Sequence, residues 1–206
     1  WQQAGQEVRQ MAAALQALSL QPNSHIALLS KNCAHWMICD LAIMMAGHVS
    51  IPLYPNLQED NVKEVLERSE SVVLFAGKLD NWDEIKNGIP SHIKCIALPF
   101  CNNDRCENWE SFTQRHEPIK ENIERDPDDI CSIVYTSGTS GEPKGAVFSF
   151  ESFAFVAQHA IEHLKFKHSD RFFSYLPLSH IAERMLVEMV SLYTGAQVSF
   201  AESLQT

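Results

Sequence analysis

The sequence predicts an α/β fold in which parallel or mixed sheets are covered by helices. Helical and extended segments alternate along the chain, which is typical of this class. Several short strands are apolar throughout, as expected for sheets that are buried on both faces. The 206 residues are 45% hydrophobic, so the chain can bury one sizeable core or two small ones.

The first part of the chain follows a βαβ order. Apolar residues recur at helical spacing in three segments and form short runs in four others. The predicted elements are helices over residues 6–18, 32–46 and 58–68, and strands over residues 26–29, 49–53, 72–76 and 93–98. We expect Ser30 or Asn32 to cap the second helix. Residues 101–105 are expected to form an exposed turn.

A charged stretch at residues 120–129 contains Pro127 and predicts a boundary between two units. We expect residues 1–120 to form an N-terminal α/β subdomain with a Rossmann-like sheet. Residues 126–206 are expected to begin a second α/β subdomain.

The second unit is predicted to alternate in the same way. Its elements are strands over residues 130–136, 146–150, 171–176 and 197–200, and helices over residues 151–164 and 183–193. Phe155, Val156 and Ala160 are expected on the apolar side of the first of these helices.

Residues 135–145, with the sequence Y-T-S-G-T-S-G-E-P-K-G, combine hydroxyls, glycines and one lysine directly behind an apolar strand. Hydroxyl and backbone N–H donors, together with a lysine charge, suit phosphate oxygens. The segment does not match the Walker A pattern G-x-x-x-x-G-K-[ST]. Counted from Gly138, Pro143 stands at the second glycine position and Gly145 at the Ser or Thr position. The sequence therefore predicts a different kind of phosphate loop.

These residues resemble the signature Y-T-S-G-T-T-G-x-P-K-G of the AMP-forming adenylate synthetases, which include acyl-CoA synthetases, luciferases and peptide-synthetase adenylation domains. The sequence departs from the signature at Ser140, where the family usually has threonine and the hydroxyl is kept. The resemblance implies that ATP is bound by Thr136, Ser137, Gly138, Thr139, Ser140, Gly141 and Lys144. It also implies that the Thr136 hydroxyl helps to hold Mg²⁺, an ion that binds few protein ligands and relies on phosphate oxygens.

A second motif, L-P-L-S-H-I-A-E-R, occupies residues 176–184. It is similar to the second core motif of the same family and closest to its form in long-chain fatty acyl-CoA synthetases. The resemblance implies that His180 lies beside the reacting carboxylate and the α-phosphate. We therefore expect His180 and Lys144 to be the catalytic residues. A lone histidine after a strand is more often structural, and it is the nearby phosphate loop that favours the catalytic interpretation.

A weaker similarity to the family lies in residues 32–36 and 46–55, which follow its N-x-x-x-W and G-x-x-x-x-P-L-x-P patterns. We expect packing and turn residues here. Trp36, Met37, Leu41 and Met44 recur at helical spacing, which is more typical of a core than of a binding site.

The chemistry implied by the resemblance has two steps. A fatty acid carboxylate attacks the α-phosphorus of ATP to give acyl-AMP and pyrophosphate, and the thiol of coenzyme A then displaces AMP. In the family, the magnesium glutamate, the ribose-binding aspartate and the small C-terminal domain lie downstream of the motifs seen here. We therefore expect the sequence to be a fragment of a long-chain fatty acid–CoA ligase, from the large N-terminal domain, and to be inactive alone.

Charge and hydropathy limit the classes of binding partner that are expected for this chain. The 16 basic residues are dispersed among 26 acidic ones, with a formal net charge of −10, so nucleic acid is not an expected partner. The longest apolar stretch, at residues 41–47, is too short to cross a bilayer, and the first residues do not resemble a signal peptide. A cytoplasmic location is expected. Peripheral membrane association stays open, although no basic amphipathic helix marks it.

The six cysteines show no framework spacing, so we expect reduced thiols. Cys95, Cys101 and Cys106 are spaced C-x5-C-x4-C and lack the short knuckle of structural zinc sites. A surface loop with free thiols is the preferred interpretation.

Two alternatives remain open at this stage. Within the enzyme class, the protein could be a fatty acyl-AMP ligase or another carboxylate-adenylating enzyme, for aromatic or amino acids. Outside that class, it could be a short binding or interaction protein that keeps the phosphate loop without catalysis. A reading frame that continues past Thr206 would favour the enzyme, and a stop codon there would favour the binding protein.

Overall fold

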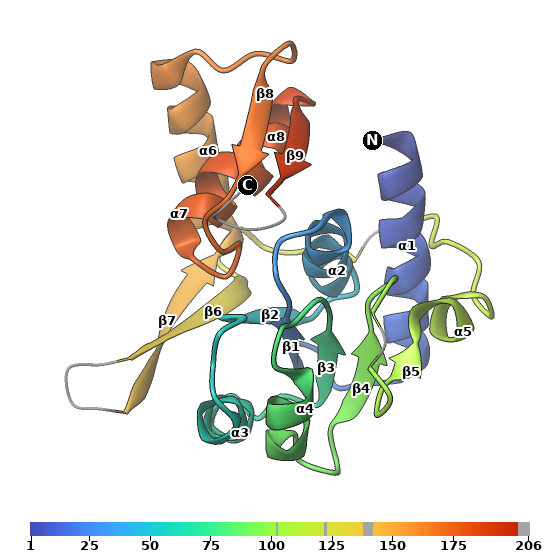
Figure 1. The fold of residues 1–206 in the computed structure, drawn as a ribbon. Helices are drawn as coiled ribbons and strands as arrows, with labels where there is room; N and C mark the ends of the chain where they lie inside the picture. The colour runs from blue at the N-terminus through green and yellow to red at the C-terminus, as the bar shows by residue number, and fades with distance from the viewer. Residues whose placement is uncertain (102, 122, 138–141, 202–206) are drawn as a thin grey trace.

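The computed structural model describes residues 1–101, 103–121, 123–137 and 142–201. Within these ranges, seven strands form a mostly parallel sheet in the order β5-β4-β3-β1-β2-β6-β7, and β8 and β9 form a separate parallel pair (Figure 1). The strands are β1 His25–Leu29, β2 Val49–Leu53, β3 Val73–Ala76, β4 Lys94–Ala97, β5 Glu107–Asn108, β6 Ile130–Ser137, β7 Pro143–Ser149, β8 Arg171–Ser174 and β9 Gln197–Phe200. Only β7 is antiparallel to its neighbour in the larger sheet. The predicted α/β class is confirmed.

Helices cover both faces of the larger sheet (Figure 1). They are α1 Gln2–Ala17, α2 Ala34–Met45, α3 Glu59–Arg68, α4 Trp82–Ile85 with the 3₁₀ turn η1 Lys86–Gly88, α5 Trp109–Thr113, α6 Phe150–Leu164, α7 Ile181–Glu183, the π-helical turn η2 Arg184–Met189 and α8 Val190–Thr194. The α1, α2 and α5 helices pack on one face, and α3 and α4 pack on the other.

Strand β1 shows why apolar strands were the right signal for a sheet covered on both sides. Its Ile26 and Leu28 side chains join the core under α1 and α2, whereas Ala27 and Leu29 join the core under α3. Successive side chains of a strand point to opposite faces, so a strand between two helical layers must be apolar at every position.

The expected cap of α2 is wrong. The N-cap residue is Cys33, whose side chain makes no capping hydrogen bond. The Ser30 hydroxyl donates to the Lys31 carbonyl and accepts from the Lys78 N–H. The Asn32 side chain is bound instead to residues near the end of β8. Both side chains are therefore engaged in other contacts.

The apolar side predicted for α6 is also wrong. Phe155 and Val156 are 59% and 41% exposed, while Phe153 and Ala157 are buried against η2. Because this helix carries apolar residues around most of its circumference, spacing alone could not identify the face that packs.

The prediction of six reduced thiols fails for one pair. Cys95 on β4 and Cys106, next to β5, form a disulfide with their Cα atoms 4.5 Å apart. Parallel pairing of β4 with β5 brings the two residues together, which their spacing in the sequence did not reveal. Cys33, Cys39, Cys101 and Cys131 are free thiols.

The larger sheet continues past the predicted boundary at residues 120–129. Ser132 on β6 pairs with Ser50 on β2, so β6 and β7 extend the sheet begun by β1 to β5. The division into residues 1–120 and 126–206 stays a prediction. Among the described helices, none is long and apolar enough to cross a lipid bilayer.

Candidate functional site

The carboxyl end of β6 carries the predicted phosphate loop. The loop is delivered by the β6–β7 hairpin, which extends to the left of the other strands in Figure 1. The predicted residues Gly138, Thr139, Ser140 and Gly141 lie outside the described residues, and Ser137 is described only as the last residue of β6.

Thr136 and Lys144 stand directly opposite each other in the hairpin. Opposed residues of antiparallel strands project from the same face, and both residues are exposed. The hairpin thus brings a hydroxyl and an ammonium group together beside the loop. A hydroxyl oxygen is a suitable ligand for Mg²⁺ when phosphate and water supply the others. No group of three His, Cys, Asp or Glu side chains in the described part of the chain could hold a metal ion.

Close packing explains why a glycine stands at position 145, which the motif alone did not reveal. A Cβ atom added at this position would lie 2.7 Å from Ile133 Cγ2 and 3.3 Å from Tyr135 Cζ. Tyr135 is the partner of Gly145 across the hairpin. The glycine therefore lets these two side chains of β6 lie close over β7, on the face of the hairpin opposite to the side chains of Thr136 and Lys144.

His180 is the N-cap residue of α7, at the start of the helical segment that follows β8. Its Nδ1 accepts a hydrogen bond from the Ala182 N–H at 3.2 Å. Because an accepting Nδ1 carries no proton, the neutral ring has its proton on Nε2. The residue is exposed, so this Nε2–H donor is available to a ligand.

Tyr54 lies close to His180. It directly follows β2, the strand next to β6, and its ring centroid is 6.5 Å from that of His180. The sequence predicted only a turn residue here. The position of Tyr54 places the His180 segment beside the end of β2.

Two polar side chains support the turn between β8 and His180. Asn32 makes three hydrogen bonds to it, with Ser174, Leu176 and Leu178. Glu183 accepts hydrogen bonds from the Ser174 hydroxyl at 2.8 Å and the Tyr175 N–H at 3.0 Å. Burial raises the pKa of Glu183, and these hydrogen bonds act in the opposite direction.

Arg184, the last residue of the second motif, is fully buried and joins this segment to the larger sheet. Its guanidinium donates to both carboxylate oxygens of Asp40, at 2.6 Å each from Nη2, and to Ser132 Oγ at 2.5 Å. Ser50 also donates to Asp40, and Ser132 donates to the Ser50 carbonyl. We call Arg184, Asp40, Ser50 and Ser132 the buried joint.

The charges of the buried joint are matched inside the protein. Burial lowers the pKa of Arg184, but attraction to Asp40 and Glu188 outweighs that effect, and the net direction is upward. The guanidinium also lies over the rings of Phe153 and Trp36, with its Cζ 5.0 Å and 5.8 Å from the two centroids. In the sequence, Arg184 is only part of a motif, and nothing near Asp40 indicates a role for it.

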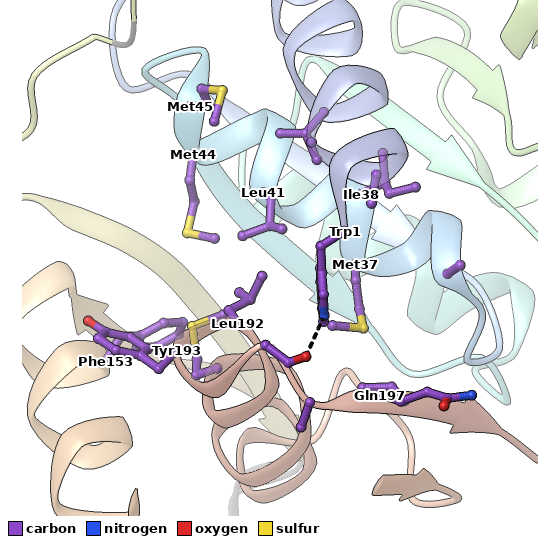
Figure 2. A pocket seen from close by; sticks show the side chains of 18 of the residues that line it. Trp1, Met37, Ile38, Leu41, Met44, Met45, Phe153, Leu192, Tyr193 and Gln197 are labelled. Carbon is purple, nitrogen blue, oxygen red and sulfur yellow. Dashed lines mark hydrogen bonds between the residues drawn. The ribbon is translucent and has the colours of Figure 1, made fainter. Parts of the chain in front are cut away.

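A separate apolar cavity of about 1080 Å³ lies between α2 and the segment from α6 to β9 (Figure 2). Its lining includes Met37, Ile38, Leu41, Met44, Phe153 and Leu192. At its edge, the Trp1 indole donates to the Gly195 carbonyl at 3.0 Å. None of its lining residues is a predicted site residue, so the cavity is distinct from the hairpin and His180.

Comparison with known proteins gives one family. The family model described as AMP-binding enzyme matches residues 1–206. Fatty acyl-CoA synthetase A of Dictyostelium discoideum is 30% identical over 99% of the chain, and long chain acyl-CoA synthetase 1 of Arabidopsis thaliana is 29% identical over 95%. The chain covers 32% of each of these relatives, about a third of their length.

Solved structures show the same fold. The anthranilate CoA ligase AuaEII, in complex with anthranoyl-AMP, matches all of the chain with a TM-score of 0.89 at 22% identity, and the chain covers 40% of it. The inhibitor-bound N-terminal domain of FACL13 from Mycobacterium tuberculosis matches 98% with a TM-score of 0.84 at 23% identity, and the chain covers 50% of it. The described fold is therefore that of the N-terminal domain of adenylate-forming ligases.

Proposed function

The chain belongs to the AMP-binding enzyme family, and we propose that the whole protein converts a long-chain fatty acid to acyl-CoA at the expense of ATP. One carboxylate oxygen attacks the α-phosphorus, and the bond to pyrophosphate breaks. The thiol sulfur of coenzyme A, after losing its proton, then attacks the acyl carbonyl, and AMP leaves. The observation that carries this proposal is the Thr136–Lys144 pair beside the phosphate loop.

In the first step the chain's own residues position charge and need not form a covalent bond to substrate. Lys144, which pairs with Thr136 in the hairpin, would lie near the β- and γ-phosphates, where its ammonium group would offset charge that develops on the leaving pyrophosphate. The hydroxyl of Thr136 would hold Mg²⁺, which would neutralise phosphate charge when bound. Coenzyme A and the fatty acid are the co-substrates.

His180 acts on the acid side of the same reaction. Its Nε2–H is free to donate because Nδ1 accepts from the Ala182 N–H. An N–H donor next to a carboxylate and the α-phosphate would help to hold their oxygens in place. This role is a proposal that rests on the motif and on the proton position.

The preference for a long acyl chain rests on two observations of different kinds. The second motif has the form found in long-chain acyl-CoA synthetases, and several relatives at 25–30% identity carry that name. The AuaEII structure acts on anthranilate, but at 22% identity it bears on the fold alone. We therefore propose a long-chain fatty acid as the substrate, and the series of fatty acids in the test below measures the preferred chain length.

The test is ATP–pyrophosphate exchange by the full-length protein, offered acetate, amino acids, aromatic acids and a series of fatty acids in parallel. We expect exchange with long fatty acids only, and acyl-CoA formation when coenzyme A is added. Exchange without thioester formation would identify an acyl-AMP ligase instead. Folded protein that shows no exchange with any acid would reduce the phosphate loop to a binding role and overturn the proposal.

A further inference from the structure

We propose that Asn32 is the positioning residue for His180. Its side-chain amide fixes the turn that presents the imidazole to the substrates, and the inference rests on the function proposed above. From the sequence, Asn32 was expected only to cap or precede a helix, with no part in the reaction. In the structure it stands just past the carboxyl end of β1 and binds a segment more than 140 residues later.

The three hydrogen bonds of Asn32 occupy both ends of its amide. Nδ2 donates to Ser174 Oγ at 2.8 Å and to the Leu176 carbonyl at 2.6 Å. Oδ1 accepts from the Leu178 N–H at 2.8 Å. An amide has two N–H donors and an acceptor oxygen, so one side chain matches a backbone donor, a backbone acceptor and a hydroxyl at once. Among the natural side chains of this length, only asparagine does so while remaining uncharged.

These contacts fix the residues immediately before His180. Leu178 is fully buried in the core formed with α1 and α2, and the His180 N–H donates to the Pro177 carbonyl at 2.8 Å. The backbone from 174 to 180 is thus held at Ser174, Leu176 and Leu178 by one amide and then closed by its own turn. A displacement at Leu178 would pass to His180 through only two peptide units.

The far side of the same turn is held by Glu183. Its carboxylate accepts from the Ser174 hydroxyl, which also accepts from Asn32, so the amide, hydroxyl and carboxylate form a chain. Glu183 belongs to α7, the helix that His180 caps. Asn32 therefore contacts the backbone at Leu176 and Leu178, just before His180, and, through Ser174, the helix that follows it. It does not contact the imidazole, so its effect on the reaction is indirect.

A purely structural contact and a positioning contact make different predictions for the Asn32→Ala and Asn32→Asp variants of the full-length protein. Because a shift of about 1 Å at a reacting group can cost about 100-fold, we expect Asn32→Ala to lower kcat for fatty acid-dependent ATP–pyrophosphate exchange by about 10- to 100-fold. The KM for ATP should change little, since the phosphate loop is on another element. Hydrogen exchange should accelerate in the peptide that contains Leu178.

The Asn32→Asp variant should give a pH response that a loss of stability alone would not produce. An ionised aspartate keeps an acceptor for the Leu178 N–H but faces the Leu176 carbonyl without a donor. A protonated aspartate regains one donor. We therefore expect its activity relative to wild type to rise as the pH is lowered toward about 6, because a carboxyl facing a carbonyl oxygen titrates above its ordinary pKa. The activity of Asn32→Ala relative to wild type should not change with pH.

Asn108→Ala is the matched control. The Asn108 side chain also accepts backbone N–H bonds, from Glu110 and Ser111, but it caps α5, which follows β5 at the edge of the larger sheet farthest from β7. It should cost stability and leave kcat unchanged. Wild-type kcat in folded Asn32→Ala, or an Asn32→Asp ratio that does not respond to pH, would overturn the proposal. Absence of exchange in the wild type would instead overturn the proposed function, and the positioning role with it.

Discussion

The buried joint and the end of the β6–β7 hairpin both use charged and hydroxyl side chains, but they lie in opposite environments. Arg184 and Asp40 are fully buried, and each satisfies the other together with Ser50 and Ser132. Thr136 and Lys144 are exposed on one face of the hairpin. A buried charge is costly unless paired, whereas an exposed charge costs little and stays available.

Because of this difference, the buried joint and the hairpin end are suited to different tasks. The buried joint connects α2, β2 and β6 to the segment that begins at His180, so it sets where the parts lie relative to one another. The hairpin end leaves its donors for a ligand. Changes in the buried joint should therefore alter folding stability first, and changes at the hairpin end should alter the reaction first.

Removal of Asp40 should give the largest effect. In Asp40→Ala the Arg184 guanidinium is left buried without a counter-charge, and we expect a loss of about 3–5 kcal/mol in the free energy of unfolding. Urea unfolding of the full-length protein measures it. The double variant Asp40→Leu with Arg184→Met removes both charges and should lose less than the single variant. Equal losses would mean that the pair is not what stabilises this region.

In contrast to Asp40→Ala, the Lys144→Ala variant should slow the reaction and change the folding stability little. We expect a 10- to 100-fold slower adenylation, equivalent to about 1.4–2.7 kcal/mol, because one charged donor to the pyrophosphate is lost. The free energy of unfolding should change by less than about 0.5 kcal/mol, since the side chain is exposed. Lys63→Ala, on the exposed side of α3, serves as the control. An unchanged adenylation rate would remove Lys144 from the site.

Gly145→Ala tests whether the hairpin end also has a packing requirement. The added methyl would meet Ile133 at 2.7 Å, so we expect a loss of about 1–2 kcal/mol in unfolding free energy from overpacking. The same substitution at Gly5 in α1 meets nothing within 4 Å and should stabilise the protein by about 0.5–1 kcal/mol. Thermal unfolding of the two variants compares them directly. A neutral Gly145→Ala would show that β6 and β7 can separate at no cost.

Glu188 should give the smallest effect and sharpen the description of the buried joint. It lies 3.6 Å from Arg184 Nε, and neither carboxylate oxygen has a hydrogen-bond partner among the described residues. Burial, followed by repulsion from Asp40, raises the pKa of Glu188 well above its ordinary 4.5, and Arg184 only partly opposes this. The folded state therefore binds the proton more tightly than the unfolded state.

The sign of the pH dependence follows from that difference. The stability contributed by the protonated Glu188 is fully present below pH 4.5 and is lost as the pH rises through the raised pKa. Glu188→Gln, which cannot ionise, should become more stable relative to wild type as the pH rises. Urea unfolding of both proteins from acidic to neutral pH measures the difference. A constant difference across that range would mean that the pKa of Glu188 is the same in the folded and unfolded states, against the upward direction expected from its burial.

Two strands near the site followed the sequence closely, whereas β7 begins three residues before the predicted strand at 146–150 and β8 ends two residues before the predicted end at 176. The predicted strand at 197–200 is β9 itself, and the strand at 130–136 is β6 with one residue more. Strand β6 is apolar and bounded by a charged stretch and a glycine-rich loop, which are local signals. The predicted helix at 183–193 is continuous, although its middle is the π-helical turn η2.

The failures share a physical cause. Which face of α6 packs depends on η2, more than 20 residues later, and the Cys95–Cys106 disulfide depends on the pairing of β4 with β5. Spacing within a segment contains no information about the partner that segment will meet. The roles of Asn32 and Asp40 were missed for the same reason, since each looked like an ordinary residue at the start or middle of a helix.

By itself, the sequence determined the fold class, most of the larger elements and the two motifs that carry Thr136, Lys144 and His180. Each of these depends on residues close together in the chain, where periodicity and backbone preference operate. Only the tertiary structure decided that Asn32 holds Leu178 and that Arg184 meets Asp40, contacts that span 146 and 144 residues. Such contacts form because the sheet and its helices bring distant segments together, and buried polar groups must then find partners among the side chains placed there.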